Sequence, residues 1–198
     1  EIDFASIIVG AKVIRSGPYR TSTSLVESLP VGNRIMALLG LRFYGYGPEA
    51  ALVPTYPVHS IGQCWSFRPP RVVSETEQRK MRLAGALSHD DNSSVDGGYQ
   101  GMFGTLSVQL ARPIHVTSIV LEHPPEEATG QFESAIRDAR IMGYESSDAS
   151  GKPWHIGSVN FDPRQGDLQE YTVATEIGGN TEVPPLASIT LAIDSNWG

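Results

Sequence analysis

Residues 104–110 of this chain read GTLSVQL, and this stretch decides the fold class. Apolar and polar residues alternate along it, which is the two-residue period of a β-strand with one buried face. Residues 188–194, SITLAID, repeat the pattern near the other end of the chain. We therefore expect two half-buried strands, with Leu106, Val108 and Leu191 on the side that faces a core.

Four more segments are rich in the Val, Ile, Tyr and Trp residues that favour strands. They are residues 114–122, 138–145, 154–161 and 169–175. Stretches rich in Pro, Gly, Asp and Ser separate them, as turns do. Short strands at this spacing, with no helices between them, predict an all-β fold, an antiparallel β-sandwich.

Length and charge limit the classes of function. The chain has 198 residues, a net charge of −7 and a pI near 5.2, which suits one large all-β domain. Binding to nucleic acid needs clustered Lys and Arg, so the composition argues against it and against anionic membrane surfaces. No apolar run approaches the roughly 20 residues of a membrane span. Contact with a membrane would therefore need a segment absent from this sequence.

Motifs for catalysis or metal binding are weak. Residues 45–50 fit the loose dinucleotide pattern G-x-G-x-x-A, but Pro54 leaves almost no helix after them, so a tight turn is favoured. The five histidines are scattered without a metal-binding pair, and there is no G-x-S-x-G nucleophile elbow. The single cysteine, Cys64, is favoured as a small buried apolar residue over a nucleophile. We expect no enzyme activity.

Four segments in order resemble a known family. They are residues 62–67 (GQCWSF), 104–110 (GTLSVQL), 121–124 (LEHP) and 194–198 (DSNWG). In this order and spacing they are similar to the SUN domain of the Sad1/UNC-84 family, the lumenal module of inner nuclear membrane proteins. The resemblance implies a single domain over residues 1–198, a galactose-binding-like sandwich with a β-hairpin lid.

Three parts of this domain are expected from the resemblance. The lid region corresponds to residues 16–46. Residues 68–100 are longer than the family's usual turn and are predicted to be an inserted surface loop. The family's last strand has no counterpart within the sequence, so we expect it to follow Gly198.

The resemblance also implies a function. SUN domains bind the C-terminal tail of a KASH protein in the perinuclear space, and this LINC complex couples the nucleus to the cytoskeleton. The tail adds a strand to the lid and its terminal carboxylate enters a polar pocket, which combines two known modes of peptide recognition. The family acts as a homotrimer, so we expect a nuclear-envelope tethering module that trimerises in the full-length protein.

Matching segments assign the binding residues. The pocket residues would be His123 and Ser134, and the lid would contribute Tyr19, Thr21, Leu38 and Leu39. The residues themselves leave a structural alternative open. His123 ends an apolar strand and would then bond a neighbouring turn, while Ser134 would cap a turn.

A cation and a disulfide are implied as well. Family members hold a K⁺-like ion, K⁺ or Na⁺, on a carbonyl loop, which here would use the backbones of Val53, Thr55, Tyr56 and Gln63. Without the resemblance this segment is a Pro-rich turn, and no other cofactor is expected. Cys64 is the disulfide candidate, with its partner in the strand beyond Gly198. Pro18 stands where many members have a lid cysteine, so no covalent link through the lid is expected.

A galactose-binding-like sandwich that recognises a glycan or another small ligand is the alternative function. The fold alone does not distinguish this function from the KASH binding that the resemblance implies. Exposed aromatic residues in loops would favour it. The candidates are Tyr19, Tyr44, Tyr46 and Trp154.

Overall fold

The structure is a computed structural model that describes residues 3–24, 35, 47–53, 65–67, 103–123, 133, 135–177 and 181–198. The strands of this part of the chain are β1 (Lys12–Val13), β2 (Gly104–Ile114), β3 (Ser118–Glu122), β4 (Ile136–Tyr144), β5 (Trp154–Asn160), β6 (Leu168–Thr172), β7 (Glu176–Ile177), β8 (Thr181–Glu182) and β9 (Leu186–Asn196). Three short 3₁₀ helices accompany them: η1 (Ile7–Val9), η2 (Pro48–Leu52) and η5 (Pro163–Gln165).

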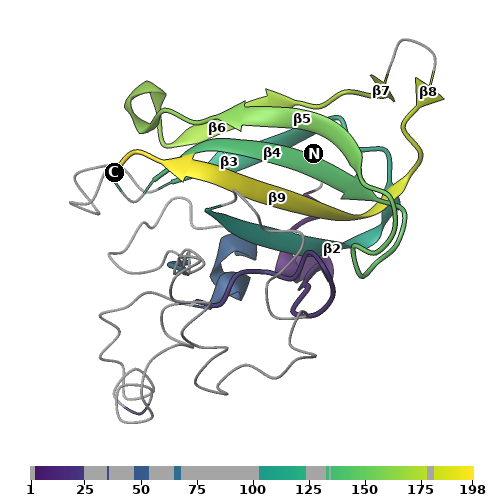
Figure 1. The fold of residues 1–198 in the computed structure, drawn as a ribbon, viewed down its shortest axis with the longest axis horizontal. Coiled ribbons are helices and arrows are strands. Elements are labelled where there is room, and N and C mark those ends of the chain that lie inside the picture. Colours follow the sequence, from purple (N-terminus) through teal and green to yellow (C-terminus); the bar gives the residue numbers. More distant parts are fainter. Residues whose placement is uncertain are drawn as a thin grey trace, which may run out of the picture.

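The described strands form antiparallel sheets. The largest has five strands in the order β1-β2-β9-β4-β5, and β3-β6 and β7-β8 form two-stranded sheets (Figure 1). The pair β3-β6 contributes Ile119, Leu121 and Tyr171 to a core that also contains Ile141 and Leu191 from the large sheet. The predicted all-β antiparallel sandwich is therefore confirmed.

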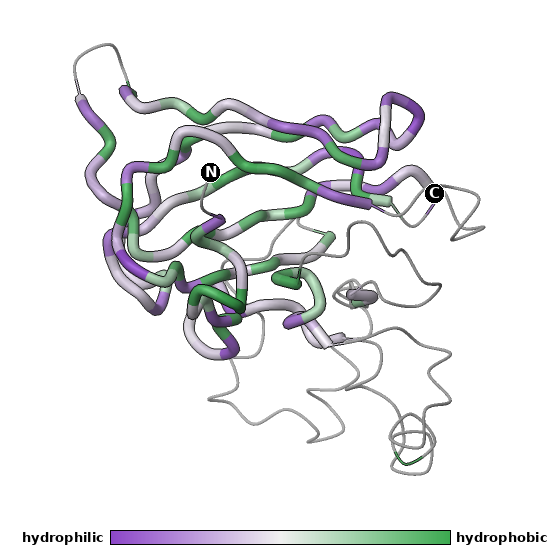
Figure 2. The backbone as a smooth tube through the Cα atoms, turned by 180° about the vertical axis from the view of Figure 1, so that it is seen from behind, coloured by the Kyte–Doolittle hydropathy of each residue, from purple (hydrophilic) through white to green (hydrophobic). Residues whose placement is uncertain are grey.

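The core between the two layers is apolar and closely packed. Ile141 and Ile193 are fully buried, and Leu186 is 1% exposed. A Cβ added at Gly143 would lie 2.3 Å from Cδ1 of Leu186, so β4 approaches this side chain as only a glycine allows. Figure 2 shows apolar stretches along the strands and polar stretches at turns such as η5. Burial of the apolar strand faces drives this packing.

The prediction that only one face of β2 and β9 is buried is wrong, because the opposite face of the large sheet is covered as well. Their alternate polar residues Thr105, Ser107, Ser188 and Thr190 are all 0% exposed. Both faces of these strands are therefore covered over much of their length. Over Thr105 and Ser107 the cover is an N-terminal segment, residues 14–22, which we call the strap. Ser188 instead donates its hydroxyl to the Ser146 carbonyl, after β4, over 2.6 Å.

The strap satisfies the polar groups that it buries. Ser107 Oγ donates to the Tyr19 carbonyl and Thr105 Oγ1 donates to the Arg20 carbonyl, the latter over 2.8 Å. Thr21 Oγ1 donates to the Ser107 carbonyl over 3.1 Å and accepts from the Ser107 amide over 2.9 Å. Buried hydroxyl groups need such partners, so the strap provides them and covers the edge of β2 beyond β1.

Several predicted features lie outside the described residues. They are the hairpin lid beyond residue 24, apart from Ile35, and the whole insert at residues 68–100. The turn predicted at residues 45–50 is described from Gly47, which caps η2 with Pro48 in its first turn. An isolated antiparallel β-bridge pairs Ser24, two residues after the strap, with Phe67, the last residue before the insert.

Candidate functional site

His123 lies where β3 ends. Its backbone N–H donates to the Asp167 carbonyl over 2.8 Å, which extends the β3–β6 ladder by one bond. Its half-buried ring is 6.2 Å from the ring of Phe161, at an interplanar angle of 54°. The end of the ladder and Phe161 therefore fix the position of this imidazole.

The segment around Ser134 meets the C-terminal residues. Ser134 lies outside the described residues, but Ala135 is fully buried and its carbonyl accepts from the Trp197 amide over 3.2 Å. A Cβ added at Gly198 would lie 2.5 Å from Cβ of Glu133. Trp197 and Gly198 are thus packed against both neighbours of Ser134 in the chain.

Phe161 and Trp197 join these two parts of the site. Nε1 of Trp197 donates to the Phe161 carbonyl over 2.9 Å, and Phe161 is 2% exposed. The ring of His123 packs on the ring of this same Phe161. His123 is therefore found at the same end of the sandwich as Glu133 and Ala135, while the role of His123 and Ser134 in a pocket stays a prediction.

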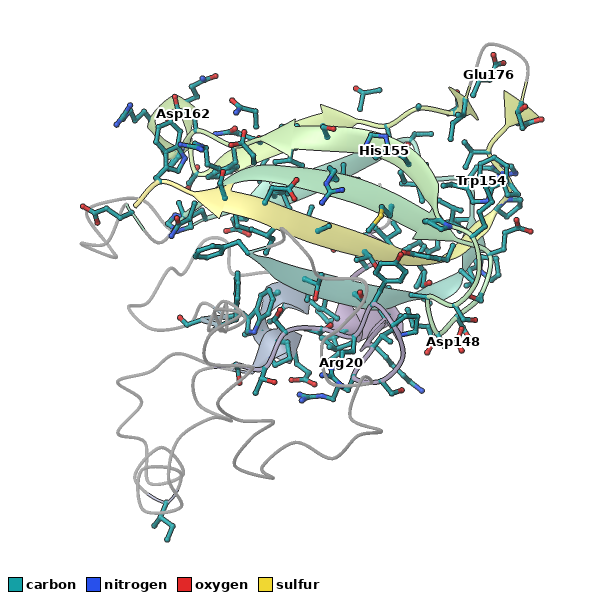
Figure 3. All side chains as sticks on the ribbon, in the orientation of Figure 1. Arg20, Asp148, Trp154, His155, Asp162 and Glu176 are labelled. Atoms are coloured by element: carbon teal, nitrogen blue, oxygen red, sulfur yellow. The ribbon has the colours of Figure 1, made fainter. Side chains whose placement is uncertain are left out.

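Arg164 adds a cation at this end of the molecule. It belongs to η5, whose first residues are capped by Asp162: Oδ1 of Asp162 accepts from the Arg164 amide over 3.1 Å. The Arg164 guanidinium lies 5.1 Å from the centre of the Trp197 ring, within the range of a cation–π contact. Figure 3 labels Asp162 at this turn, near the C-terminal end of β9.

The sequence did not single out Phe161 or Arg164. Phe161 ends a predicted strand and Arg164 lies in a predicted turn. The sequence therefore predicted the local structure of both residues but no place for them in a site. A usable signal was the Asp-Pro-Arg order at residues 162–164, because Asp before Pro is a typical start of a short helix.

Side chains of the C-terminal DSNWG motif connect the end of β9 to the strand beside it, β4. Asp194 accepts from Arg140 of β4 over 2.7 and 2.9 Å, a two-bond pair. Ser195 Oγ donates to Asp138 over 2.6 Å. This bond, followed by those from Arg137 and Asn160, lowers the pKa of Asp138 from 3.8 to about 2. The motif thus ties β9 to β4 with charge as well as backbone bonds.

The described lid residues belong to another part of the molecule. Tyr19 packs on Tyr144 with ring centres 5.5 Å apart, and Thr21 is 8% exposed with its hydroxyl bonded to Ser107. Figure 3 shows Arg20, their neighbour, below β2 and far from Asp162. Both side chains fix the strap to the sheet, and the structure does not bring them together with His123. Leu38 and Leu39 lie outside the described residues.

One residue of the predicted cation loop is described. Val53 follows η2, is 45% exposed, and donates its amide to the Ala50 carbonyl over 3.3 Å. Thr55, Tyr56, Gln63 and Cys64 lie outside the described residues. Within the described part of the chain, no group of three or more His, Cys, Asp or Glu side chains could hold a metal ion.

Together, the sheets and the C-terminal end define an all-β sandwich with a half-buried histidine directly after the end of β3. The family model for the Sad1/UNC-like C-terminal domain matches residues 76–198. This is more than half of the sequence, and the chain belongs to the Sad1/UNC-like, or SUN, family. The suspected resemblance is thereby confirmed.

Human sperm-associated antigen 4 protein is a relative of this chain. It is 29% identical over 107 residues, which cover 50% of this chain and 22% of that protein. The match thus spans about a fifth of the length of this relative.

One solved structure in particular shares the fold. Allantoicase from Saccharomyces cerevisiae superimposes with a TM-score of 0.52 and 12% identity, over 98% of this chain and 40% of that chain. At this identity the likeness concerns the fold alone. The family 32 carbohydrate-binding module of Streptococcus pneumoniae EndoD gives a TM-score of 0.42 at 14% identity, over 78% of this chain and 76% of that chain.

No described helix is long and apolar enough to span a membrane.

Proposed function

We propose that this domain is a tethering module that binds the C-terminal tail of a KASH protein and links the nucleus to the cytoskeleton. Membership of the SUN family supports the class of function. The observation that carries the proposal is the packing of His123 on Phe161, whose carbonyl is bonded to Trp197, which also bonds Ala135 beside Ser134. Two residues assigned to one pocket thus belong to segments that meet at one end of the fold.

The chemistry of this end suits a terminal carboxylate. A half-buried imidazole and a serine hydroxyl both donate hydrogen bonds to a carboxylate. Arg164 adds positive charge at the turn beside them. Hydrogen bonds with a charged group are stronger than neutral ones, which favours a free chain end over an internal segment of peptide.

The wider setting follows from the same proposal. The module would work in the perinuclear space, attached to the inner nuclear membrane by another part of the protein, and as a homotrimer. It would act by binding and not by catalysis. The backbone of residues 53–63 would hold K⁺ or Na⁺ beside the bound tail, and Leu38 and Leu39 would contact the tail from the lid.

Calorimetry with a synthetic KASH tail tests the proposal. The full-length lumenal protein should bind the tail with a free carboxylate and lose at least about tenfold in affinity for the C-amidated copy, because a charged hydrogen bond contributes about 1.5–3 kcal/mol. His123→Ala and Ser134→Ala should weaken binding. The matched controls are His155→Ala and Ser158→Ala, which alter exposed residues of β5, and they should bind as the wild type does.

The glycan-binding alternative has little support from the described aromatic residues. Tyr19 packs on Tyr144, and Nε1 of Trp154 donates to Glu145 over 3.2 Å. Tyr44 and Tyr46 lie outside the described residues. If the assembled protein ignored the tail in both forms, the tethering proposal would be wrong and glycan binding would be the next function to test.

A further inference from the structure

The half-buried side chain of Gln169, in β6, spans the base of the turn at residues 162–167. Its Nε2 donates to the carbonyls of Asp162 and Gly166, the latter over 3.1 Å, and its Oε1 accepts from the Asp162 amide over 3.3 Å. Oε1 also accepts from the Tyr171 hydroxyl over 2.8 Å. One side chain thus bonds the first residue of the turn and a residue near its end, and we call these four bonds the Gln169 clamp.

The chemistry of the clamp needs both halves of a side-chain amide. Nε2 meets two carbonyl groups, which only accept, and Oε1 meets an N–H and an O–H, which donate here. A carboxylate would offer no donor to the carbonyls, and an apolar side chain would offer neither group. The reversed amide would place its oxygen against two carbonyl oxygens, so the surrounding groups define its orientation. The turn therefore specifies the residue at position 169.

The same turn connects two groups that hold His123. Phe161 directly precedes the turn and packs its ring on the imidazole. Asp167 is the last residue of the turn, and its carbonyl accepts from the His123 amide over 2.8 Å. Gly166, with a φ of 129°, comes just before Asp167, and glycine is the residue with the most backbone freedom. A bond to the Gly166 carbonyl therefore limits how far Asp167 can move.

We propose that Gln169 is a positioning residue, which sets the place of the His123 imidazole by fixing Phe161 and Asp167 relative to each other. A hydrogen bond to a carboxylate depends on direction as well as distance. A displaced imidazole would therefore lose affinity for the charged end of a bound tail. This consequence for tail binding rests on the proposed function, whereas the effect of Gln169 on His123 does not.

Hydrogen exchange at the His123 amide tests the clamp in the full chain without a tail. Gln169→Met keeps the length of the side chain but removes the amide, so exchange at His123 should become at least about fivefold faster, the effect of losing more than one hydrogen bond. Gly143→Ala is the control for reduced stability, because Gly143 pairs with Trp154 at the other end of the β4–β5 ladder from Asn160. It should leave exchange at His123 unchanged. Unchanged exchange in Gln169→Met would overturn the proposal.

Tyr171→Phe is a milder variant for the same measurement. It keeps Gln169 but removes the hydroxyl that donates to Oε1 and lies 3.1 Å from the Asn160 carbonyl. Exchange at the His123 amide should be at least about twofold faster than in the wild type, as expected for one weakened hydrogen bond. If Gln169→Met fails to fold, wild-type exchange at His123 in Tyr171→Phe would overturn the proposal.

A double-mutant cycle with the tail distinguishes positioning from general stability. In calorimetry on the full-length lumenal protein, Gln169→Met should weaken binding of the tail with a free carboxylate at least about fivefold. It should leave the C-amidated tail unaffected and add nothing in the His123→Ala background, because the two residues act as one unit. Gly143→Ala should bind both tails as the wild type does.

The outcomes separate this inference from the KASH proposal. An equal loss of affinity for both tails, or a further loss in the His123→Ala background, would overturn the positioning role of Gln169. If the wild type bound neither tail, the KASH proposal would fail, while faster exchange at His123 in Gln169→Met would still establish that Gln169 positions this residue.

Discussion

Gly143 is a residue at which packing of the core tolerates little change. An added Cβ would lie 2.3 and 2.9 Å from the two methyl carbons of Leu186 and 3.1 Å from its Cγ. Leu186 is 1% exposed and belongs to the main core cluster. Gly143→Ala should therefore lower the free energy of unfolding by about 1–3 kcal/mol, the usual cost of overpacking.

Gly157 of the neighbouring strand is the matched control for Gly143. Its added Cβ would meet Ile141 Cδ1 at 3.4 Å, an ordinary contact. Gly157→Ala should be neutral or slightly stabilising, because alanine restricts the unfolded chain. Urea unfolding measures the stability of both variants, provided that the slope of the free energy against urea concentration is unchanged. Equal midpoints for the two variants would refute the packing argument.

Asp138 makes part of the stability depend on pH. Its folded pKa, about 2, is below the value of 3.8 expected without these bonds, first because Ser195 donates to it and then because Arg137 and Asn160 do. A depressed pKa gives stability that is complete above about pH 4 and is lost as the pH falls towards 2. The side chain is 41% exposed, so solvent reduces the size of this effect.

Substitution of Asp138 tests the sign of this dependence. At pH 7, Asp138→Asn should unfold at a lower urea concentration than the wild type, and the difference should shrink between pH 4 and pH 2. Ser195→Ala should raise the pKa of Asp138 towards 3.8, as followed by NMR titration of the carboxyl carbon. A difference between wild type and Asp138→Asn that stays constant down to pH 2 would contradict this account.

At the scale of elements, alternation predicted where the strands lie but not how they are covered. The period of two located β2 and β9, because side chains on a strand point to opposite faces whatever packs there. It also suggested that Thr105, Ser107 and Thr190 face solvent, whereas all three are fully buried. Hydroxyl groups leave both outcomes open, since a buried partner can replace water. Strap carbonyls do so for Thr105 and Ser107, and the Ser107 hydroxyl does so for Thr190. These contacts link residues more than 80 positions apart, which no local pattern reveals.

Thr21 attaches the strap to β2 through two hydrogen bonds with the Ser107 backbone. Thr21→Val keeps the shape of the side chain but leaves the Ser107 amide without the oxygen that accepts its hydrogen. The loss should cost about 1–3 kcal/mol of unfolding free energy, the penalty for a buried polar group without a partner. Hydrogen exchange at the Ser107 amide should also be faster in Thr21→Val than in the wild type. Thr23→Val, at an exposed position, should change neither quantity, and a similar loss in both variants would show that the strap is not held in this way.

At the scale of the whole molecule, the sequence proposed residues for the candidate site but did not indicate what connects their segments. Family motifs pointed to His123 and Ser134, which lie eleven positions apart along the chain on either side of a turn-rich segment. The structure shows that Phe161 and Trp197, from β5's end and β9's end, hold the two segments together. Both bridging residues directly follow strands, β5 and β9, whose periodicity identifies only core positions, so their place at the site depends on tertiary packing.

Trp197 therefore tests whether the end of the sandwich acts as one unit. Trp197→Phe keeps an aromatic ring under Arg164 but removes the Nε1 donor to the buried Phe161 carbonyl. We expect a loss of about 0.5–1.5 kcal/mol in unfolding free energy, and weaker binding of the KASH tail because Phe161 supports the His123 ring. Trp154→Phe, which removes an exposed bond to Glu145, is the matched control and should stay within about 0.5 kcal/mol with unchanged tail binding. If Trp197→Phe lowered stability without affecting the tail, Trp197 would only stabilise the fold, and His123 would have to be positioned by the β3–β6 ladder alone.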